Sequence, residues 1–161
     1  MLEELDVRPT EFKDEIGLQN NELCQGLTAQ QLDNLASVIT SLELESGSKL
    51  FSKGDMGNEI FMVSNGQIDI RLPTTKHHYK RLATCRPGSF FDELALLNPG
   101  PRVADAVATH HSKLFVLNRD GLDRLGKTFP DTAVRLLMTL AEIQVNHLRW
   151  STSELQRLSE W

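Results

Sequence analysis

The chain has 161 residues but only two cysteines, Cys24 and Cys85, which lie far apart and form no Cys-x-x-Cys pair. We therefore expect neither a disulfide framework nor a zinc site, and two free thiols favour a reducing, cytoplasmic location. Long apolar runs are missing as well, since none approaches the ~18 residues that a membrane-spanning helix needs. The acidic N-terminus has no apolar signal core, so we expect no insertion into a membrane.

Positive charge is scarce, because 17 lysines and arginines stand against 22 acidic residues and give a net charge of −5. General binding to nucleic acid usually needs a basic stripe, so we do not expect it here. A small anion needs only local positive charge and is compatible with this composition. Hydrophobic residues make up 40% of the chain, enough for one ordinary core, and the length suits one domain with flanking helices.

The first part of the chain has a helical pattern, and the period then changes. Residues 1–23 are polar with sparse apolar positions, and we expect a helical arm there. Thr28 and Gln31 form a capping-box pattern ahead of apolar residues at helical spacing, which predicts an amphipathic helix over 28–40. Over 42–118 short apolar runs alternate with turn residues, which predicts about eight short strands in a closed or rolled antiparallel sheet.

One turn signal stands out within the strand region. Asn65 and Gly66 separate two strand-like runs, residues 60–63 and 68–72. Because Asn-Gly accepts the positive φ angles of a tight turn, it is the strongest local signal for a hairpin, so we expect these two runs to pair.

The helical period returns after residue 118. We expect a short helix over 121–126 capped by Asp120, and then a long helix over 131–160 with a break near 151–153. The sequence thus predicts three parts: an N-terminal arm over 1–23, a β-rich domain with two short helices over 24–130, and a C-terminal helix over 131–161.

The chemistry of the chain is concentrated in residues 87–104. They predict a strand, a turn, a short helix over 93–97 and a Pro/Gly loop that delivers Arg102 to the start of the next strand. A helix N-terminus offers unpaired N–H groups and partial positive charge, and an arginine beside it completes a small anion site. Glu93, at the same place, is an acceptor-only group that suits the hydroxyls of a ribose.

This segment resembles the phosphate-binding cassette of cyclic nucleotide-binding domains, in which Phe-x-Glu-Leu-Ala-Leu-Leu is followed by Pro-Arg. Residues 54–66 are similar to the glycine-rich turn and hairpin of that family, and residues 102–108 look like the strand after its cassette. The resemblance extends roughly over residues 23–148. It implies a mainly β fold, an eight-stranded β-roll bracketed by helices, that acts as a regulatory sensor of a cyclic nucleotide and not as an enzyme.

The roles that this family assigns carry over only onto matching positions. Glu93 would accept a hydrogen bond from the ribose 2′-hydroxyl, Arg102 would pair with the cyclic phosphate, and the backbone N–H groups of Ala95 and Val103 would complete the phosphate cradle. Val103 lacks the hydroxyl that the family associates with guanine recognition, which favours cAMP over cGMP. The site residues implied in this way are Phe91, Asp92, Glu93, Leu94, Ala95, Arg102, Val103 and Ala104.

Asp92 departs from the family pattern, which has glycine between the phenylalanine and the glutamate. At positive φ, replacing glycine costs on the order of 1 kcal/mol, and aspartate is among the better tolerated substitutes. A carboxylate ~6 Å from the expected phosphate would repel it by roughly 3 kcal/mol at an effective dielectric of ~20, or about a hundredfold in affinity. Aspartate is also a strong N-cap. We therefore expect either weakened nucleotide binding or a self-capped, empty site.

Two functions follow from the resemblance and stay open. The first is a cyclic nucleotide receptor in which the helix after Asn118 acts as a hinge and the helix after Pro130 as a lid or a homodimer seam. The second is a nucleotide-free domain used for dimerisation or intramolecular regulation, in which Glu93 and Arg102 form only a structural ion pair. Runs such as residues 81–84 look most like domains appended to bacterial sulfate-type transporters or glutaminases, which implies a covalently linked parent protein.

Other functions have less support in the sequence. A transcription factor of the catabolite-activator type needs a helix-turn-helix after the long helix, and only about ten residues follow Trp150. The pairs His77-His78 and His110-His111 each offer one ligand per face of a strand, so we expect no metal site. We find no nucleophile–base pair and no glycine-rich phosphate loop that would support an enzyme.

Overall fold

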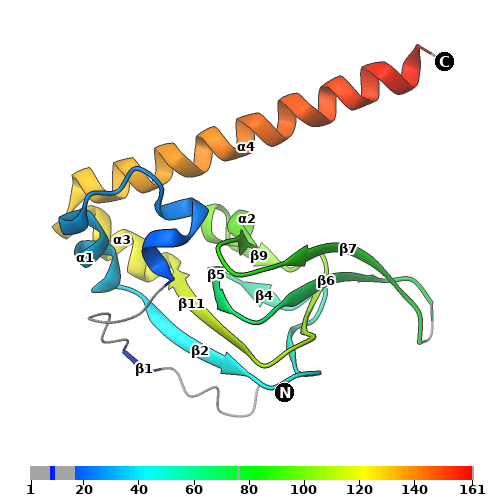
Figure 1. The fold of residues 1–161 in the computed structure, drawn as a ribbon, viewed down its shortest axis with the longest axis horizontal. Helices are drawn as coiled ribbons and strands as arrows, with labels where there is room; N and C mark the ends of the chain where they lie inside the picture. Colours follow the sequence, from blue (N-terminus) through cyan, green and yellow to red (C-terminus); the bar gives the residue numbers. More distant parts are fainter. Residues whose placement is uncertain (1–7, 10–16, 76, 161) are drawn as a thin grey trace.

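The computed structural model describes residues 8–9, 17–75 and 77–160. The strands form a rolled β structure, and the helices gather at one end of it (Figure 1). The last helix starts beside the other helices and extends far away from them (Figure 1). This arrangement confirms the expected mainly β fold with flanking helices.

Two antiparallel sheets and a two-stranded ribbon make up the roll. The first sheet has the strand order β1-β2-β11-β5-β8, the second has the order β3-β10-β6-β7, and β4 pairs with β9. The first sheet comprises β1 (Arg8–Pro9), β2 (Thr40–Leu44), β11 (Ser112–Asn118), β5 (Glu59–Asn65) and β8 (Phe90–Phe91). The other strands are β3 (Lys49–Phe51), β10 (Asp105–Ala108), β6 (Ile68–Pro73), β7 (Tyr79–Cys85), β4 (Met56–Gly57) and β9 (Gly100–Pro101). Short strands such as β4 and β9 raise the number above the expected eight.

The turn at Asn65 and Gly66 does not join paired strands. β5 pairs with β11 and β8 in the first sheet, whereas β6 pairs with β10 and β7 in the second. The expected hairpin is therefore wrong, and the turn carries the chain from one sheet to the other. Gly66 has a φ of 84°. A Cβ at this position would also overlap the side chain of Ser112, so both the backbone and the available space require glycine.

The segment before the first α-helix is described only in part. Residues 1–7 and 10–16 of the expected arm lie outside the described residues. The remainder holds the two-residue strand β1 and two 3₁₀ helices, η2 (Leu18–Asn20) and η3 (Glu22–Cys24). Asn21 lies between the two 3₁₀ helices, and its Oδ1 accepts a hydrogen bond from the Leu23 N–H at 3.0 Å.

The first α-helix, α1 (Ala29–Ala36), begins at the predicted capping box. Thr28 Oγ1 accepts from the Gln31 N–H at 3.1 Å, and Gln31 Oε1 accepts from the Thr28 N–H at 3.0 Å. The helix ends at Ala36 and not at residue 40, because Thr40 already pairs with β11 in the first sheet.

The helix α3 (Arg119–Thr128) directly follows β11. Its N-cap is Asn118 and not the predicted Asp120, since Asn118 Oδ1 accepts from the Gly121 N–H at 2.7 Å. Asp120 already lies in the first turn, where its carboxylate accepts from Arg124 Nε at 3.0 Å.

The last helix, α4 (Pro130–Ser159), runs without a break through residues 151–153. The hydroxyls of Thr152 and Ser153 donate to the carbonyls four residues earlier, at 2.9 and 3.0 Å. Such bonds satisfy serine and threonine without interrupting a helix, so the expected break does not form.

Two hydrophobic clusters hold these elements together. The roll cluster lies inside the roll and includes Phe51, Phe61 and Phe91, with the centroids of Phe61 and Phe91 5.2 Å apart. The helix cluster joins the first sheet to the helices. Its members include Phe115 of β11, Leu125 of α3 and Leu136 of α4. The helices therefore pack on the roll through a core of their own.

Candidate functional site

The cassette, residues 91–104, folds as a strand, a short helix and a loop. β8 ends at Phe91, α2 (Glu93–Leu97) follows, and the loop leads through β9 to Arg102. Asp92 joins β8 to α2 in the left-handed conformation, with φ 67° and ψ 31°. The position thus needs a positive φ, which aspartate adopts at a cost on the order of 1 kcal/mol relative to glycine.

Asp92 does not cap α2. Its side chain makes no hydrogen bond to the helix amides, and its carboxylate contacts the guanidinium of Arg102 instead. A capping residue normally has an extended backbone, whereas the left-handed backbone of Asp92 aims its side chain elsewhere. The expectation of a self-capped helix is therefore wrong. The carboxylate nevertheless engages the group that the resemblance assigns to the phosphate.

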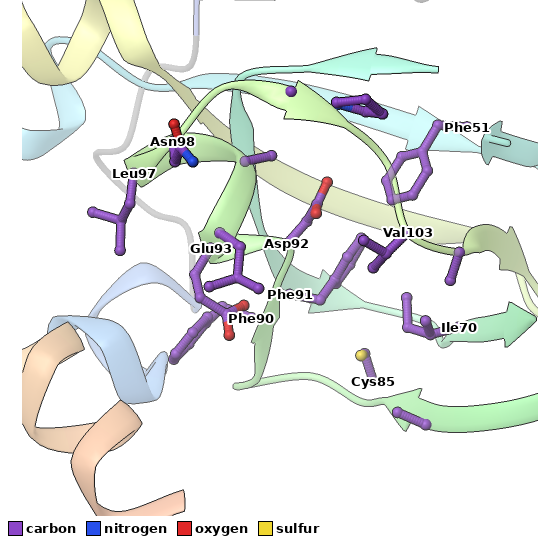
Figure 2. Close-up of a pocket in the computed structure, with 16 residues that line it drawn as sticks. Phe51, Ile70, Cys85, Phe90, Phe91, Asp92, Glu93, Leu97, Asn98 and Val103 are labelled. Atoms are coloured by element: carbon purple, nitrogen blue, oxygen red, sulfur yellow. The ribbon is translucent and has the colours of Figure 1, made fainter. Parts of the chain in front are cut away.

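A cavity of about 520 Å³ lies against the cassette (Figure 2). This volume falls within the range of small-molecule sites. The second sheet contributes Phe51 of β3, Ile70 of β6, and Ala83 and Cys85 of β7 to the wall. The predicted site residues on the wall are Phe91, Asp92, Glu93, Leu94, Ala95, Val103 and Ala104. The structure thus brings together every predicted site residue except Arg102.

Arg102 turns away from this cavity and is buried, with 5% of its surface exposed. Its guanidinium contacts Asp92, lies over the Phe51 ring at 4.3 Å from the centroid, and is 3.4 Å from a carboxylate oxygen of Glu59. A side chain at Gly57 would overlap the guanidinium, so glycine at this position makes room for it. The Nε of Arg102 is buried and donates to no described group.

Asp92 and Glu93 are the charged residues in the wall of the cavity. Asp92 and Glu93 are adjacent, yet their carboxylates leave the cassette in different directions (Figure 2). Among the described residues, no lysine or arginine lines the cavity. Burial lowers the pKa of the Arg102 guanidinium, and the nearby charges of Glu59 and Asp55 act against that change. Because arginine stays charged in proteins, Arg102 provides one positive charge that Asp92 and Glu59 offset.

The helix α2 is held at both ends by the C-terminal helices. Glu93 Oε1, at its start, accepts a hydrogen bond from Gln144 Nε2 of α4 at 2.9 Å. At its end, Arg119 Nη1 of α3 donates to the carbonyls of Leu96 and Leu97 at 3.3 and 3.0 Å. Neither contact could be predicted from the sequence, because helical spacing does not reveal which polar side chain of a long helix faces a distant segment.

Cys85 is a buried free thiol that also lines the cavity. Burial raises the pKa of this thiol to about 11, and the negative charges of Glu93, Asp69 and Glu22 act in the same direction. The thiol is therefore uncharged near neutral pH and adds to the apolar part of the wall. A spacing pattern in the sequence carries no signal for this placement.

Trp150 and the two histidine pairs do not line the cavity. Trp150 is 68% exposed on α4, and Trp161 is outside the described residues. Within residues 8–9, 17–75 and 77–160, no group of histidine, cysteine, aspartate and glutamate could hold a metal ion. No helix in the described part of the chain is long and apolar enough to cross a membrane.

Known proteins match most of this chain. Residues 41–129 match the family described as "Cyclic nucleotide-binding domain". The chain is 29% identical over 142 residues to the cyclic AMP receptor protein of Thermus thermophilus, covering 88% of this chain and 64% of that protein. It is 28% identical over 138 residues to glutaminase 1 of Bradyrhizobium diazoefficiens, covering 86% of this chain and 22% of that protein. The chain thus spans less than two thirds of either relative.

A solved structure supports the same assignment. The N-terminal domain of a transcriptional regulator from Streptomyces coelicolor is 28% identical and superposes with a TM-score of 0.73. The match covers 86% of this chain and 94% of that one. The family match includes most of the roll together with α2 and α3, and it spans more than half of the chain. The chain belongs to the cyclic nucleotide-binding domain family.

Proposed function

We propose that this chain is the sensor part of a regulatory protein and that it binds a cyclic nucleotide, cAMP in preference to cGMP, in the cavity against the cassette. The observation that carries the proposal is the cavity itself. Its wall is mostly apolar, which suits a purine base, and Glu93 supplies an acceptor for a ribose hydroxyl. A regulatory and not a catalytic role fits this arrangement.

The phosphate would be held by the loop side of the cavity. The backbone N–H of Val103 donates to no described residue and would be available to a phosphate oxygen. The N–H of Ala95 donates to the Asp92 carbonyl at 3.2 Å, a long bond that a phosphate could replace. Arg102 would supply positive charge once its guanidinium exchanges the Asp92 carboxylate for the phosphate.

The preference for cAMP rests on Val103. This side chain lines the cavity and is 70% exposed, so it is accessible to a ligand. It has no hydroxyl to offer to a guanine. We expect Val103→Thr to raise the affinity for cGMP while leaving that for cAMP nearly unchanged, as measured by calorimetric titration of both nucleotides. An equal change in both affinities would contradict this assignment.

We further propose that occupancy of the cavity reaches the C-terminal helices through α2. Leu94 and Ala95 of α2 form part of the cavity wall, and the last carbonyls of the same helix accept from Arg119 of α3. A ligand that moves α2 would therefore also move α3. The helix cluster then connects α3 to the first half of α4.

The exposed face of α4 suits a homodimer seam. Over residues 134–148 apolar side chains recur there at alternating spacings of four and three, the pattern of a two-stranded coiled coil, and Leu155 follows seven residues later. They are Val134, Met138, Ala141, Val145, Leu148 and Leu155, all exposed. The proposed partner is a second copy of the chain. Leu148→Glu should shift the mass measured by light scattering from dimer to monomer, whereas a wild-type protein that is already monomeric would contradict the seam.

A second candidate function is a nucleotide-free domain of the same fold. The contact between Asp92 and Arg102 favours it, because the guanidinium already has a carboxylate partner from within the chain. Such a domain would serve dimerisation or intramolecular regulation of a longer protein.

Thermal unfolding with cAMP and cGMP separates the two candidates. A specific ligand at a hundred times its Kd adds about 2.7 kcal/mol to the free energy of unfolding. We expect such a gain with cAMP and its loss in an Arg102→Ala variant whose circular dichroism shows it to be folded. If neither nucleotide at millimolar concentration changes the unfolding temperature, the nucleotide-free domain is the better description.

A further inference from the structure

The hydrogen bond between Gln144 and Glu93 lies where α4 leaves the body of the protein. The last buried side chain of α4 is Leu140. From residue 145 onward nearly all side chains are exposed, and the helix extends away from the roll (Figure 1). Beyond Gln144, the hydrogen bonds and ion pairs found for described side chains of α4 stay within the helix. Gln144 is thus the outermost of the described polar contacts that hold α4 to the rest of the chain.

Glu93 has room for a second partner. A carboxylate has two oxygens with about four acceptor sites. Gln144 occupies Oε1, and Oε2 accepts no hydrogen bond from a described residue. Because Glu93 also lines the cavity, a ligand hydroxyl can donate to Oε2 while Gln144 stays on Oε1.

Gln144 and a ligand hydroxyl would each favour the binding of the other to Glu93. A free glutamate side chain has several rotamers, and fixing it costs conformational entropy. Once Gln144 fixes the carboxylate, a ligand meets an acceptor that is already oriented, which favours binding. By thermodynamic linkage, a bound ligand must then favour the contact with Gln144 to the same degree.

We propose that Gln144 is a positioning residue that presents Glu93 to a hydroxyl-bearing ligand, and that the ligand in turn strengthens the attachment of the middle of α4 to α2. The effect on the ligand rests on the proposed function. The attachment of α4 through Gln144 does not, because the hydrogen bond joins two side chains of the chain itself.

Three variants isolate the amide donor. Gln144→Met keeps the length and helix propensity of the side chain but removes the donor. Gln144→Lys keeps a donor. Gln156→Met makes the same chemical change at an exposed position farther along α4 and is the matched control. Two measurements are made: amide hydrogen exchange of peptides covering 138–150 without nucleotide, and calorimetric titration with cAMP.

The proposal predicts a definite pattern in both measurements. Without nucleotide, Gln144→Met should speed exchange in residues 141–150 by about three- to tenfold, whereas Gln144→Lys and Gln156→Met should resemble the wild type. Glu93→Ala should have the same effect, and combining it with Gln144→Met should add nothing, because both remove one interaction. With cAMP, Gln144→Met should bind about five- to tenfold more weakly.

Each contrary result has one meaning. If amide hydrogen exchange in Gln144→Met equals that in the Gln156→Met control, the proposed attachment of α4 through Gln144 is wrong. Tighter cAMP binding by Gln144→Met overturns the positioning role, because it means that the ligand displaces Gln144 from Glu93. If the wild type binds no cyclic nucleotide, the proposed function fails, and the exchange measured without nucleotide alone decides whether Gln144 attaches α4.

Discussion

Replacing Asp92 should produce a tighter cyclic nucleotide receptor. The carboxylate of Asp92 contacts the guanidinium of Arg102, and the two side chains are 14% and 4% exposed. A phosphate must therefore compete with a buried internal anion for the same cation. We expect Asp92→Gly to remove this competitor and to free the guanidinium for the phosphate.

The size of the effect follows from the charge that is removed. A carboxylate ~6 Å from a phosphate at an effective dielectric of ~20 repels it by roughly 3 kcal/mol, which corresponds to about a hundredfold in Kd. Glycine also relieves the left-handed backbone of Asp92, by on the order of 1 kcal/mol, but this appears in the free energy of unfolding and not in binding. Arg102 keeps Glu59 at 3.4 Å and the Phe51 ring, so the variant should remain folded.

A second substitution separates charge from backbone. Asp92→Asn removes the charge, and asparagine tolerates the left-handed region. If charge is the cause, calorimetry should show that Asp92→Asn and Asp92→Gly tighten cAMP binding alike. Asp120→Asn removes one negative charge from an exposed position and is the control for net charge. Wild-type affinity in both Asp92 variants would refute the reasoning, and tightening by glycine alone would show that the charge of Asp92 is not the cause.

Three further perturbations test other parts of the site. Arg119→Ala removes the donor to the last carbonyls of α2, so urea denaturation should show that the free energy of unfolding falls by about 1 kcal/mol. Arg119→Lys should lower it by less. An unchanged denaturation midpoint in Arg119→Ala would count against the contact. Gly57→Ala places a methyl group against the Arg102 guanidinium and should lower the free energy of unfolding by about 1–3 kcal/mol. Gly100→Ala is the control, because its methyl group would meet nothing closer than 3.8 Å. Equal melting temperatures for the two variants would contradict this prediction. Alkylation of Cys85, followed by mass spectrometry of its peptide, should rise about tenfold per pH unit up to its pKa of about 11, and a plateau near pH 8 would argue against that value.

The sequence was informative wherever the signal is local. The Thr28–Gln31 capping box and the short helix α2 are determined by neighbouring residues, and both were predicted correctly. The residues of the cassette are also close in sequence, and most of the predicted site residues line one cavity in the structure.

Prediction failed where distant segments compete. The turn at Asn65 and Gly66 has the composition of a hairpin, but β11 and β10 are better partners for the flanking strands than those strands are for each other. The sequence could not show which groups surround Arg102. Its actual direction depends on the Phe51 ring of β3 and on Glu59 of β5, and no spacing in the sequence brings these residues together.

The division of the interior into a roll cluster and a helix cluster has a consequence for local unfolding. Phe91 belongs to the roll cluster and Leu96 to the helix cluster, and β5 likewise contributes Phe61 to the first and Met62 to the second, so the first sheet is the boundary between the two cores. Proteins often unfold locally in contiguous cooperative units of this kind. We expect the helical unit to detach while the roll stays closed, and the roll would then retain its own part of the cavity wall, including Phe51 and Phe91. An effector that binds α4 and holds it against the roll would thus prevent partial opening of the cavity without contacting the ligand.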